Sequence, residues 1–169
     1  METKHRPSEP ETALDALLED LPQETEYPKA NLVKRFIAHF LDGLVAAFAA
    51  MLVGLLSGAL GGITGALYFL VRDGLSLDFM DQRSLGKRIM KLRPVRLDGA
   101  PMDLEASFRR NWMWALGGLS SSAFFGLGTI LGIAGGVIGL YEVYKVVTDP
   151  RGRRLGDEMA GTQVIEVDA

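Results

Sequence analysis

Two long apolar blocks dominate the pattern of this chain. Residues 36–71 contain one charged residue, Asp42, and residues 111–144 contain one, Glu142. A membrane-spanning helix needs ~20 residues to cross ~30 Å of hydrocarbon. Each block, with a few flanking residues, is too long for one such helix and long enough for two short ones. The pattern therefore predicts four helices, near 32–55, 60–72, 108–125 and 129–148.

Glycine-rich stretches interrupt both blocks near their middles and are candidates for the turns, from Ser57 to Gly62 and from Phe125 to Gly128. Small residues at four-residue spacing also let helix backbones approach closely in lipid. The glycines either build the turns or line helix contacts, and both alternatives favour tight hairpins or a self-associating bundle. The spaced glycines are Gly54, Gly58, Gly62, Gly128, Gly132, Gly136, Gly135 and Gly139.

Basic residues flank the ends of both blocks, whereas the predicted turns inside the blocks carry no charge. Sixteen of the eighteen Lys and Arg fall in residues 29–35, 72–110 or 145–154. Basic loops face the cytoplasm, so each block should cross the membrane an even number of times. We predict an all-α polytopic protein of the bacterial inner (plasma) membrane, with four transmembrane helices in two hairpins and both termini cytoplasmic.

The remaining composition excludes several kinds of site. The chain has no cysteine, which excludes disulfides and thiolate metal sites, and its two histidines are far apart at positions 5 and 39. We expect no metal site and no cofactor. Residues 1–28 form an acidic tail that lacks the basic start and apolar core of a signal peptide. The tail should be disordered and cytoplasmic, with one short helix conceivable at Glu11–Leu21.

The predicted membrane domain, residues 29–169, includes a basic cytoplasmic loop at 73–107 and a C-terminal segment at 149–169. Residues 91–97 alternate loosely and are followed by an Asp-Gly turn signal, so we expect a small strand or β-hairpin with which residues 162–167 could pair. Asp103 can cap the third long helix, and Gly161 can end a short helix that begins near Arg154. A central loop motif consists of Ser84, Gly86, Lys87 and Arg88.

Polar residues inside the blocks are the candidate site. Arg35, His39 and Asp42 lie on one face of the first helix, about two turns deep at Asp42. An ionisable residue within a span usually faces the bundle interior and pairs. Asp42 either binds a cation or proton beside His39, or belongs to a structural ion network. In that network His39 could bridge to Arg35, or a second helix or the basic loop could supply a cation. For Glu142 we expect an interfacial ion pair with Lys145.

Several of these motifs together resemble the RDD family of bacterial membrane proteins. They are the Arg35–Asp42 segment, the Arg72-Asp73-Gly74 exit, Ser84–Arg88, and Arg154–Asp157 followed by Ala160–Thr162. The resemblance implies that Arg35, Asp42 and Asp157 are the family's arginine and two aspartates. It also implies cation/proton exchange as one suggested activity. Family descriptions often count two transmembrane regions, whereas each block here looks long enough for a hairpin.

We therefore predict a protein that supports cation, proton or small-solute transport through a polar site at Asp42 and His39. Arg35, Asp42, Asp157, Arg72 and Arg154 would form the surrounding charge network. The alternative is a non-catalytic scaffold or accessory subunit that docks a partner through its basic loop. No catalytic set suggests an enzyme. Anionic lipids on the cytoplasmic side and other copies of the chain are the expected partners, and nucleic acid is not.

Overall fold

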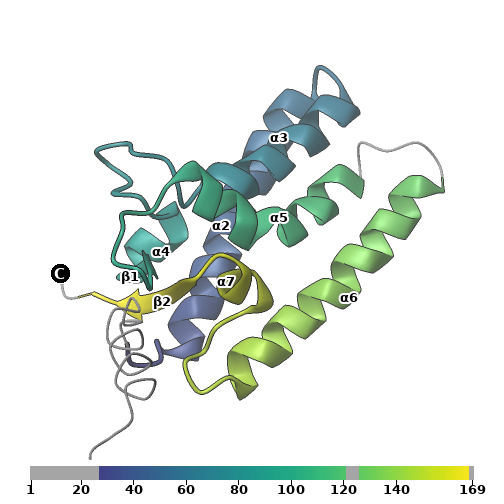
Figure 1. The fold of residues 1–169 in the computed structure, drawn as a ribbon. Coiled ribbons are helices and arrows are strands. Elements are labelled where there is room, and N and C mark those ends of the chain that lie inside the picture. The colour runs from purple at the N-terminus through teal and green to yellow at the C-terminus, as the bar shows by residue number, and fades with distance from the viewer. Residues whose placement is uncertain (1–26, 121–125, 168–169) are drawn as a thin grey trace, which may run out of the picture.

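A computed structural model describes residues 27–120 and 126–167 of the chain. The acidic tail and its conceivable helix at Glu11–Leu21 lie outside the described residues. Four longer helices form the body of the molecule, and two short helices and two strands lie together at one end of them (Figure 1). The elements are α2 (Leu32–Gly54), α3 (Gly58–Val71), α4 (Leu85–Ile89), β1 (Leu92–Arg96), α5 (Leu104–Ser120), α6 (Leu127–Thr148), α7 (Leu155–Met159) and β2 (Thr162–Glu166).

Helices lie close to all four predicted ranges, and they pair as expected, α2 with α3 and α5 with α6. Helix α2 leads through residues 55–57 into α3, which packs against α2 and α5, and α5 packs against α6 (Figure 1). Helix α5 begins four residues before the predicted start at 108, because the Asp103 carboxylate accepts a hydrogen bond from the Ala106 N–H at 2.7 Å and caps the helix as expected. The predicted end of this helix at 125 falls on residues that are not described.

The position of the first turn differs from the prediction. Gly61 and Gly62 lie inside α3 and not in the turn, and Gly58 is the first residue of the helix. Gly61 allows the close approach of the two helices, since a Cβ there would collide with the Ala50 carbonyl oxygen. Four-residue spacing was a poor guide to such contacts, because a Cβ at Gly58 or Gly136 would meet open space.

The strand prediction was right, but the element is not a hairpin. β1 pairs antiparallel with β2, from Leu92 opposite Glu166 to Arg96 opposite Thr162. The two strands are separated in sequence by both α5 and α6. The small sheet therefore joins the loop after the first hairpin to the segment after the second, and it ties the two halves of the chain together.

The order of the elements reveals an internal repeat that the sequence analysis missed. A long helix, a second apolar helix, a short helix and a strand occur as α2-α3-α4-β1 and again as α5-α6-α7-β2. The short helix and strand recur at a constant offset of seventy positions, with helices at Leu85–Ile89 and Leu155–Met159 and strands at Leu92–Arg96 and Thr162–Glu166. The sequence signal is short, an Arg-x-Leu-Gly motif at residues 83–86 and again at 153–156, whose Leu-Gly pair opens each short helix.

The geometry of the two halves agrees with this repeat. Lys91 and Gly161, equivalent positions after the short helices, both have positive φ, at 54° and 59°. This is the left-handed conformation that ends many helices, and Gly161 was predicted to end α7. The strand register is centred on Pro94 and Val164, which are also equivalent. The strands and short helices of the two halves are thus related by a local two-fold axis through the sheet.

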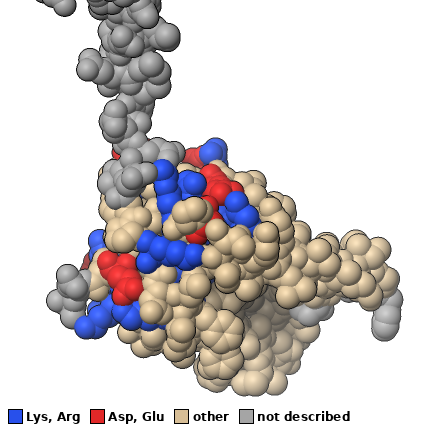
Figure 2. All heavy atoms as spheres, turned by 90° about the horizontal axis from the view of Figure 1, so that it is seen from below, with Lys and Arg blue, Asp and Glu red and all other residues tan. Residues whose placement is uncertain are grey.

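The exposed and buried residues are distributed as in a membrane protein. Helices α2 and α6 are each long and apolar enough to cross a membrane, whereas α3 is apolar but has only fourteen residues. Large apolar side chains on α2 and α6 point outward, with Phe36 71% exposed. Charged side chains gather at the end of the molecule that carries the sheet (Figure 2). Lipid is the solvent that suits the uncharged surface.

Gly86 and Gly156 provide a test of how closely each short helix packs on the first long helix of its half. A Cβ at Gly86 would collide with the Ala38 carbonyl oxygen on α2, and one at Gly156 with the Arg110 carbonyl oxygen on α5. Gly86→Ala and Gly156→Ala should each lower the free energy of unfolding by about 1–3 kcal/mol through overpacking. Thermal unfolding in detergent, followed by tryptophan fluorescence, measures the effect.

Gly136→Ala is the matched control, because a Cβ there meets nothing within 4 Å. It should be neutral or slightly stabilising, since alanine favours a helix more than glycine. If Gly86→Ala and Gly156→Ala behaved like the control, the tight docking of the short helices would be wrong.

Candidate functional site

The interior of the sheet end combines a small apolar cluster around Leu92 and Val164 with many buried charged side chains. The largest fully buried side chains of the described residues include Arg72, Arg110, Glu142, Asp42, Asp73 and Asp157. Buried charges are costly unless they are paired and hydrogen-bonded. The contacts of each carboxylate therefore decide what this site can do.

Asp42 on α2 is held by three donors, two from the end of α3 and one from α4. Its Oδ2 lies 3.0 Å from Arg72 Nη1, and its Oδ1 accepts hydrogen bonds from the Gly86 N–H at 2.8 Å and the Tyr68 hydroxyl at 3.1 Å. Only 1% of the residue is exposed. His39 does not bridge Asp42 to Arg35, because its ring packs against Trp114 with 4.2 Å between ring centroids. Arg72 is the cation that the sequence left unidentified.

Asp73, which the sequence analysis did not single out as a site residue, forms a second buried centre. Its carboxylate lies 2.6 Å from Lys87 Nζ and accepts a hydrogen bond from Asn111 Nδ2 at 3.1 Å. The Ser84 N–H also donates to it, at 3.3 Å. The predicted loop motif therefore folds back onto the end of α3. Ser84 and Lys87 join the network, whereas Arg88 is exposed.

Asp157 on α7 is the third centre, and three cations surround it. Arg110 Nη2 lies 2.8 Å away, Arg35 Nη2 3.2 Å and Arg154 Nη2 3.3 Å. The predicted network of Arg35, Arg154 and Asp157 is thus assembled in space. Arg35 also donates to the Gly152 carbonyl oxygen, so the start of α2 is bound to the C-terminal segment.

Arg110 and Asn111 on α5 connect the centres. The Arg110 guanidinium lies between Asp157 and Asp73, with 3.6 Å from its Nε to Asp73 Oδ2. Asn111 Oδ1 accepts from Arg72 and from Arg154, both at 3.3 Å. The sequence analysis read Arg110 only as a residue flanking the membrane block and missed this role. No local pattern indicates it, because the partners come from both halves of the chain.

Glu142 does not pair with Lys145, and that prediction was wrong. Lys145 instead bonds Glu158 at 2.8 Å. Glu142 points inward from α6, where its Oε1 accepts from the Gly156 N–H at 3.0 Å and its Oε2 lies 3.5 Å from Arg154 Nε. Glu142 and Asp42 thus each accept from the glycine N–H of a short helix, although Asp42 lies on the first helix of its half and Glu142 on the second.

The network shifts the pKa values of its groups outside the long helices. Burial opposes ionisation of Asp73, but Lys87, Arg110 and Arg72 hold its pKa well below 3.8. Burial similarly opposes ionisation of Asp157, and Arg154, Arg110 and Arg35 lower its pKa below the ordinary value. Burial lowers the pKa of Lys87 to about 7, against the attraction of Asp73. Both aspartates are ionised at neutral pH.

A cavity of about 360 Å³ lies between α2 and α6, directly over this network. Apolar side chains from α2, α6 and the two strands line it, together with charged side chains of the network. The predicted site residues Arg35, His39, Asp42, Arg72 and Arg154 all line it, together with Lys87, Arg110, Trp114 and Glu142. The cavity therefore collects polar groups from both halves of the repeat.

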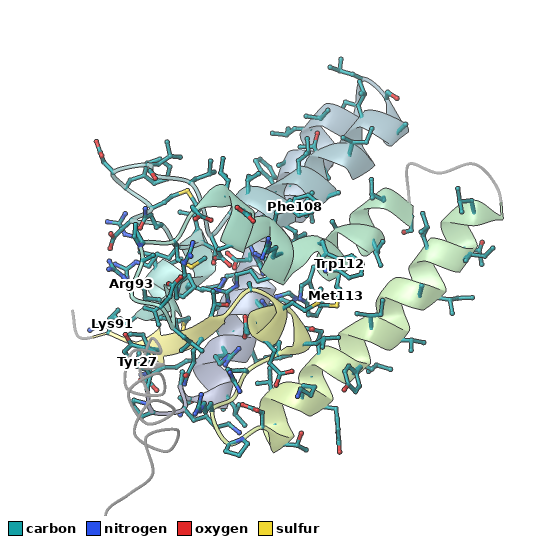
Figure 3. All side chains as sticks on the ribbon, in the orientation of Figure 1. Tyr27, Lys91, Arg93, Phe108, Trp112 and Met113 are labelled. Carbon is teal, nitrogen blue, oxygen red and sulfur yellow. The ribbon has the colours of Figure 1, made fainter. Side chains whose placement is uncertain are left out.

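Other basic residues of the cytoplasmic loop lie outside this site. Arg93 pairs with Asp81, and Arg96 pairs with Asp98 and Asp103. Figure 3 shows Lys91 and Arg93 beside the sheet, apart from Trp112 and Met113 on α5. No group of three or more His, Asp or Glu in the described ranges could hold a metal ion.

Comparison with known proteins agrees with the motifs. The model of the RDD family matches residues 29–161, which is more than half of the chain. The match covers α2 through α7 and every charged residue of the network. No curated protein and no solved structure matches the chain.

The contacts of Asp157 predict the outcome of a charge swap. Arg35→Asp combined with Asp157→Arg should not restore stability, because the new guanidinium at position 157 would face Arg110 and Arg154. Breaking a buried ion pair costs about 3–5 kcal/mol, and the double variant should lose at least as much as either single one. Unfolding midpoints in detergent provide the measurement.

The exposed pair of Glu105 and Arg109 is the control for this swap. Exchanging its charges should change the midpoint little, as surface pairs contribute about 0–1 kcal/mol. Full recovery in the double variant of Arg35 and Asp157 would show that Arg110 and Arg154 do not share Asp157.

The lowered pKa values predict a loss of stability in acid. Asp73 and Asp157 have folded pKa values below 3.8, so the unfolded state binds their protons first as the pH falls. Their stabilising contribution is complete above the ordinary value and is lost below it. The midpoint temperature of thermal unfolding should therefore fall as the pH is lowered from about 5 to about 3. A midpoint that did not change over this range would contradict the ionised network.

Proposed function

The chain belongs to the RDD family, and from this premise we propose that it is a multi-pass inner-membrane protein that moves cations, protons or small solutes. The polar cavity between α2 and α6 would be the transport site. The observation that carries the proposal is that Asp42 and Glu142, from the two halves of the repeat, both line this cavity. Ionisable residues inside spanning helices commonly mark such pathways.

The two carboxylates have similar surroundings. Each accepts a hydrogen bond from the N–H of a glycine in a short helix, and each lies near an arginine, Arg72 for Asp42 and Arg154 for Glu142. Glu142 Oε2 has no hydrogen bond among the described residues. In this proposal the oxygen, which lies 3.5 Å from Arg154 Nε, takes up a proton or cation that enters the cavity. A proton or cation that binds Asp42 would compete with Arg72. Because Arg72 lies at the end of α3, this binding would change the contact between α2 and α3.

Membrane crossing by both hairpins is part of this proposal. The positive-inside rule supports it, because the charged sheet end holds the basic residues and the α2–α3 turn carries none. Helices α3 and α5 are shorter than a full span. We propose that α2 and α6 span the bilayer on either side of α3 and α5, and that the bilayer thins locally to match the length of these shorter helices. Both termini would then be cytoplasmic, and a chain this small would act as a homo-oligomer.

The scaffold alternative has less support from the loop. Its basic side chains mostly pair within the molecule, as Lys87 with Asp73, Arg93 with Asp81 and Arg96 with Asp98. Few positive charges therefore remain for docking a partner. Co-purification of a stoichiometric partner without any flux would nevertheless favour the scaffold.

Ion flux tests the proposed transport role. Asp42→Asn and Glu142→Gln should each reduce cation-driven proton flux in reconstituted vesicles to the level of protein-free vesicles, because each removes a negative charge from the cavity. Glu105→Gln, an exposed change on α5, should leave the flux as in the parent protein. Unfolding midpoints would confirm that the variants are folded. Normal flux in both cavity variants would refute a transport role for these carboxylates.

Cysteine labelling tests the topology, since the chain has no native thiol. Leu56, in the α2–α3 turn, is 84% exposed, and Ile89, at the end of α4, is 67% exposed. An impermeant maleimide applied to intact cells should label Leu56→Cys and should label Ile89→Cys only after lysis. Labelling of both or neither in intact cells would contradict the two-hairpin topology.

A further inference from the structure

Large apolar side chains of α2 and α6 line the cavity and open onto the surface of the molecule, and we call this surface the α2–α6 groove. It lies between the first turns of α2 and the last turns of α6, at the sheet end (Figure 1). Phe36 is 71% exposed, and Val143 and Val147 are each 55% exposed, so the described part of the chain leaves the groove uncovered. The groove consists of Leu32, Val33, Phe36, Val143, Val146 and Val147.

The groove lies at the level of charged residues and not deep in the uncharged part of the helices. Lys34 follows Val33 on α2, and Lys145 precedes Val147 by two residues on α6. In the proposed topology this level is the cytoplasmic boundary of the bilayer. A helix with one apolar and one charged face suits such a boundary, so the groove fits an amphipathic helix.

The described chain begins beside this groove. Lys29 Nζ donates to the carbonyl oxygens of Val147 and Asp149, at 2.9 and 3.0 Å, and so holds the residues before α2 against the end of α6. Gln163 Nε2 also donates to the Tyr27 carbonyl oxygen at 2.9 Å. The acidic tail, residues 1–26, is therefore attached next to the groove.

The acidic tail contains one apolar pattern, and its spacing fits a groove. Its four leucines occur at i, i+3, i+4 and i+7, which are the anchor positions of a helix that binds in an apolar groove. A helix over residues 11–21 would be about 16 Å long, and a helix this short is marginal by itself in water. The leucines are Leu14, Leu17, Leu18 and Leu21, and the acidic residues on the other sides are Asp15, Glu19 and Asp20.

We propose that residues 11–21 dock as an amphipathic helix on the α2–α6 groove of their own chain. Residues 22–26 connect this segment to the described chain and can span about 17 Å, and such a short connection gives a high effective concentration at the groove. The bare bilayer is a poorer partner, because its anionic cytoplasmic surface repels an acidic segment.

Docking would cover the entrance to the cavity and so restrict access to Asp42 and Glu142, which line it. The proposal thus goes beyond the transport function by giving the tail a role in controlling the cavity. The docking itself does not require flux, and its test measures none.

Cross-linking between two introduced cysteines tests the docking, since the chain has no native thiol. The full chain would be reconstituted in phosphatidylcholine vesicles with Leu14→Cys and either Val143→Cys or Phe36→Cys. A short bismaleimide should join the tail cysteine to a groove cysteine within one chain, because docking brings the leucine face onto these side chains. Denaturing electrophoresis separates this product from unlinked protein and from linked pairs of chains.

Matched variants separate docking from chance collisions of the tethered tail. Leu17→Glu with Leu18→Glu should abolish most of the cross-link, because it places two charges in the apolar contact. Thr12→Glu with Ala16→Glu is the control, since it adds the same two charges on the opposite side of the helix. This control should keep the cross-link of the parent chain, and both variants retain the same connection to α2.

Trp114 provides a second measurement, because it lines the cavity whereas Trp112 does not. These are the only tryptophans of the chain. In Trp112→Phe protein, phosphatidylcholine with brominated acyl chains should quench Trp114 more strongly when Leu17→Glu and Leu18→Glu release the tail. The control variant on the opposite side of the helix should leave the quenching unchanged.

Equal cross-linking in the leucine variant and its control would show collisions without docking and would overturn the proposal. Cross-links found only between chains would show that a second copy covers the groove, and absence of any cross-link would show that lipid fills it; either result would overturn the proposal. Docking in protein that shows no flux would leave the tail site standing and remove the transport function. Flux without docking would do the reverse.

Discussion

The buried ionic contact of Arg110 with Asp157 and Asp73 is the interaction on which the rest of the structure depends. Arg110 comes from α5, whereas Asp73 ends the first hairpin and Asp157 lies on α7, so one guanidinium holds three separate segments. In lipid, apolar side chains gain little by facing one another. The charged end of the molecule therefore receives its specificity from ion pairs, each of which would be costly to leave unpaired.

The repeat explains how so many charges are accommodated in a small molecule. Each half inserts a short helix beneath its hairpin, and the glycine of that helix approaches a long helix so closely that no side chain would fit. Its backbone N–H then reaches a carboxylate, Asp42 in one half and Glu142 in the other. The β1–β2 pairing completes the connection between halves.

The two halves are not equivalent where they meet. Helices α3 and α5 pack directly against each other, whereas α2 and α6 flank the cavity beside the network. The proposed transport would use this cavity, where the carboxylates of Asp42 and Glu142 would respond to protons and cations.

Local patterns in the sequence were sufficient for the membrane assignment, the four helices to within a few residues, the Asp103 cap, the Gly161 helix end and the two strands. These depend on periodicity, charge and turn chemistry, which neighbouring residues determine. The same patterns identified Asp42 and Arg35 as residues needing partners but did not identify those partners. Arg72, Asp73, Arg110 and Asn111 meet only because helix ends distant in sequence come together, and long flexible side chains can reach several alternative partners. The tertiary structure alone decided which charges pair, and hence that the cavity lies between α2 and α6.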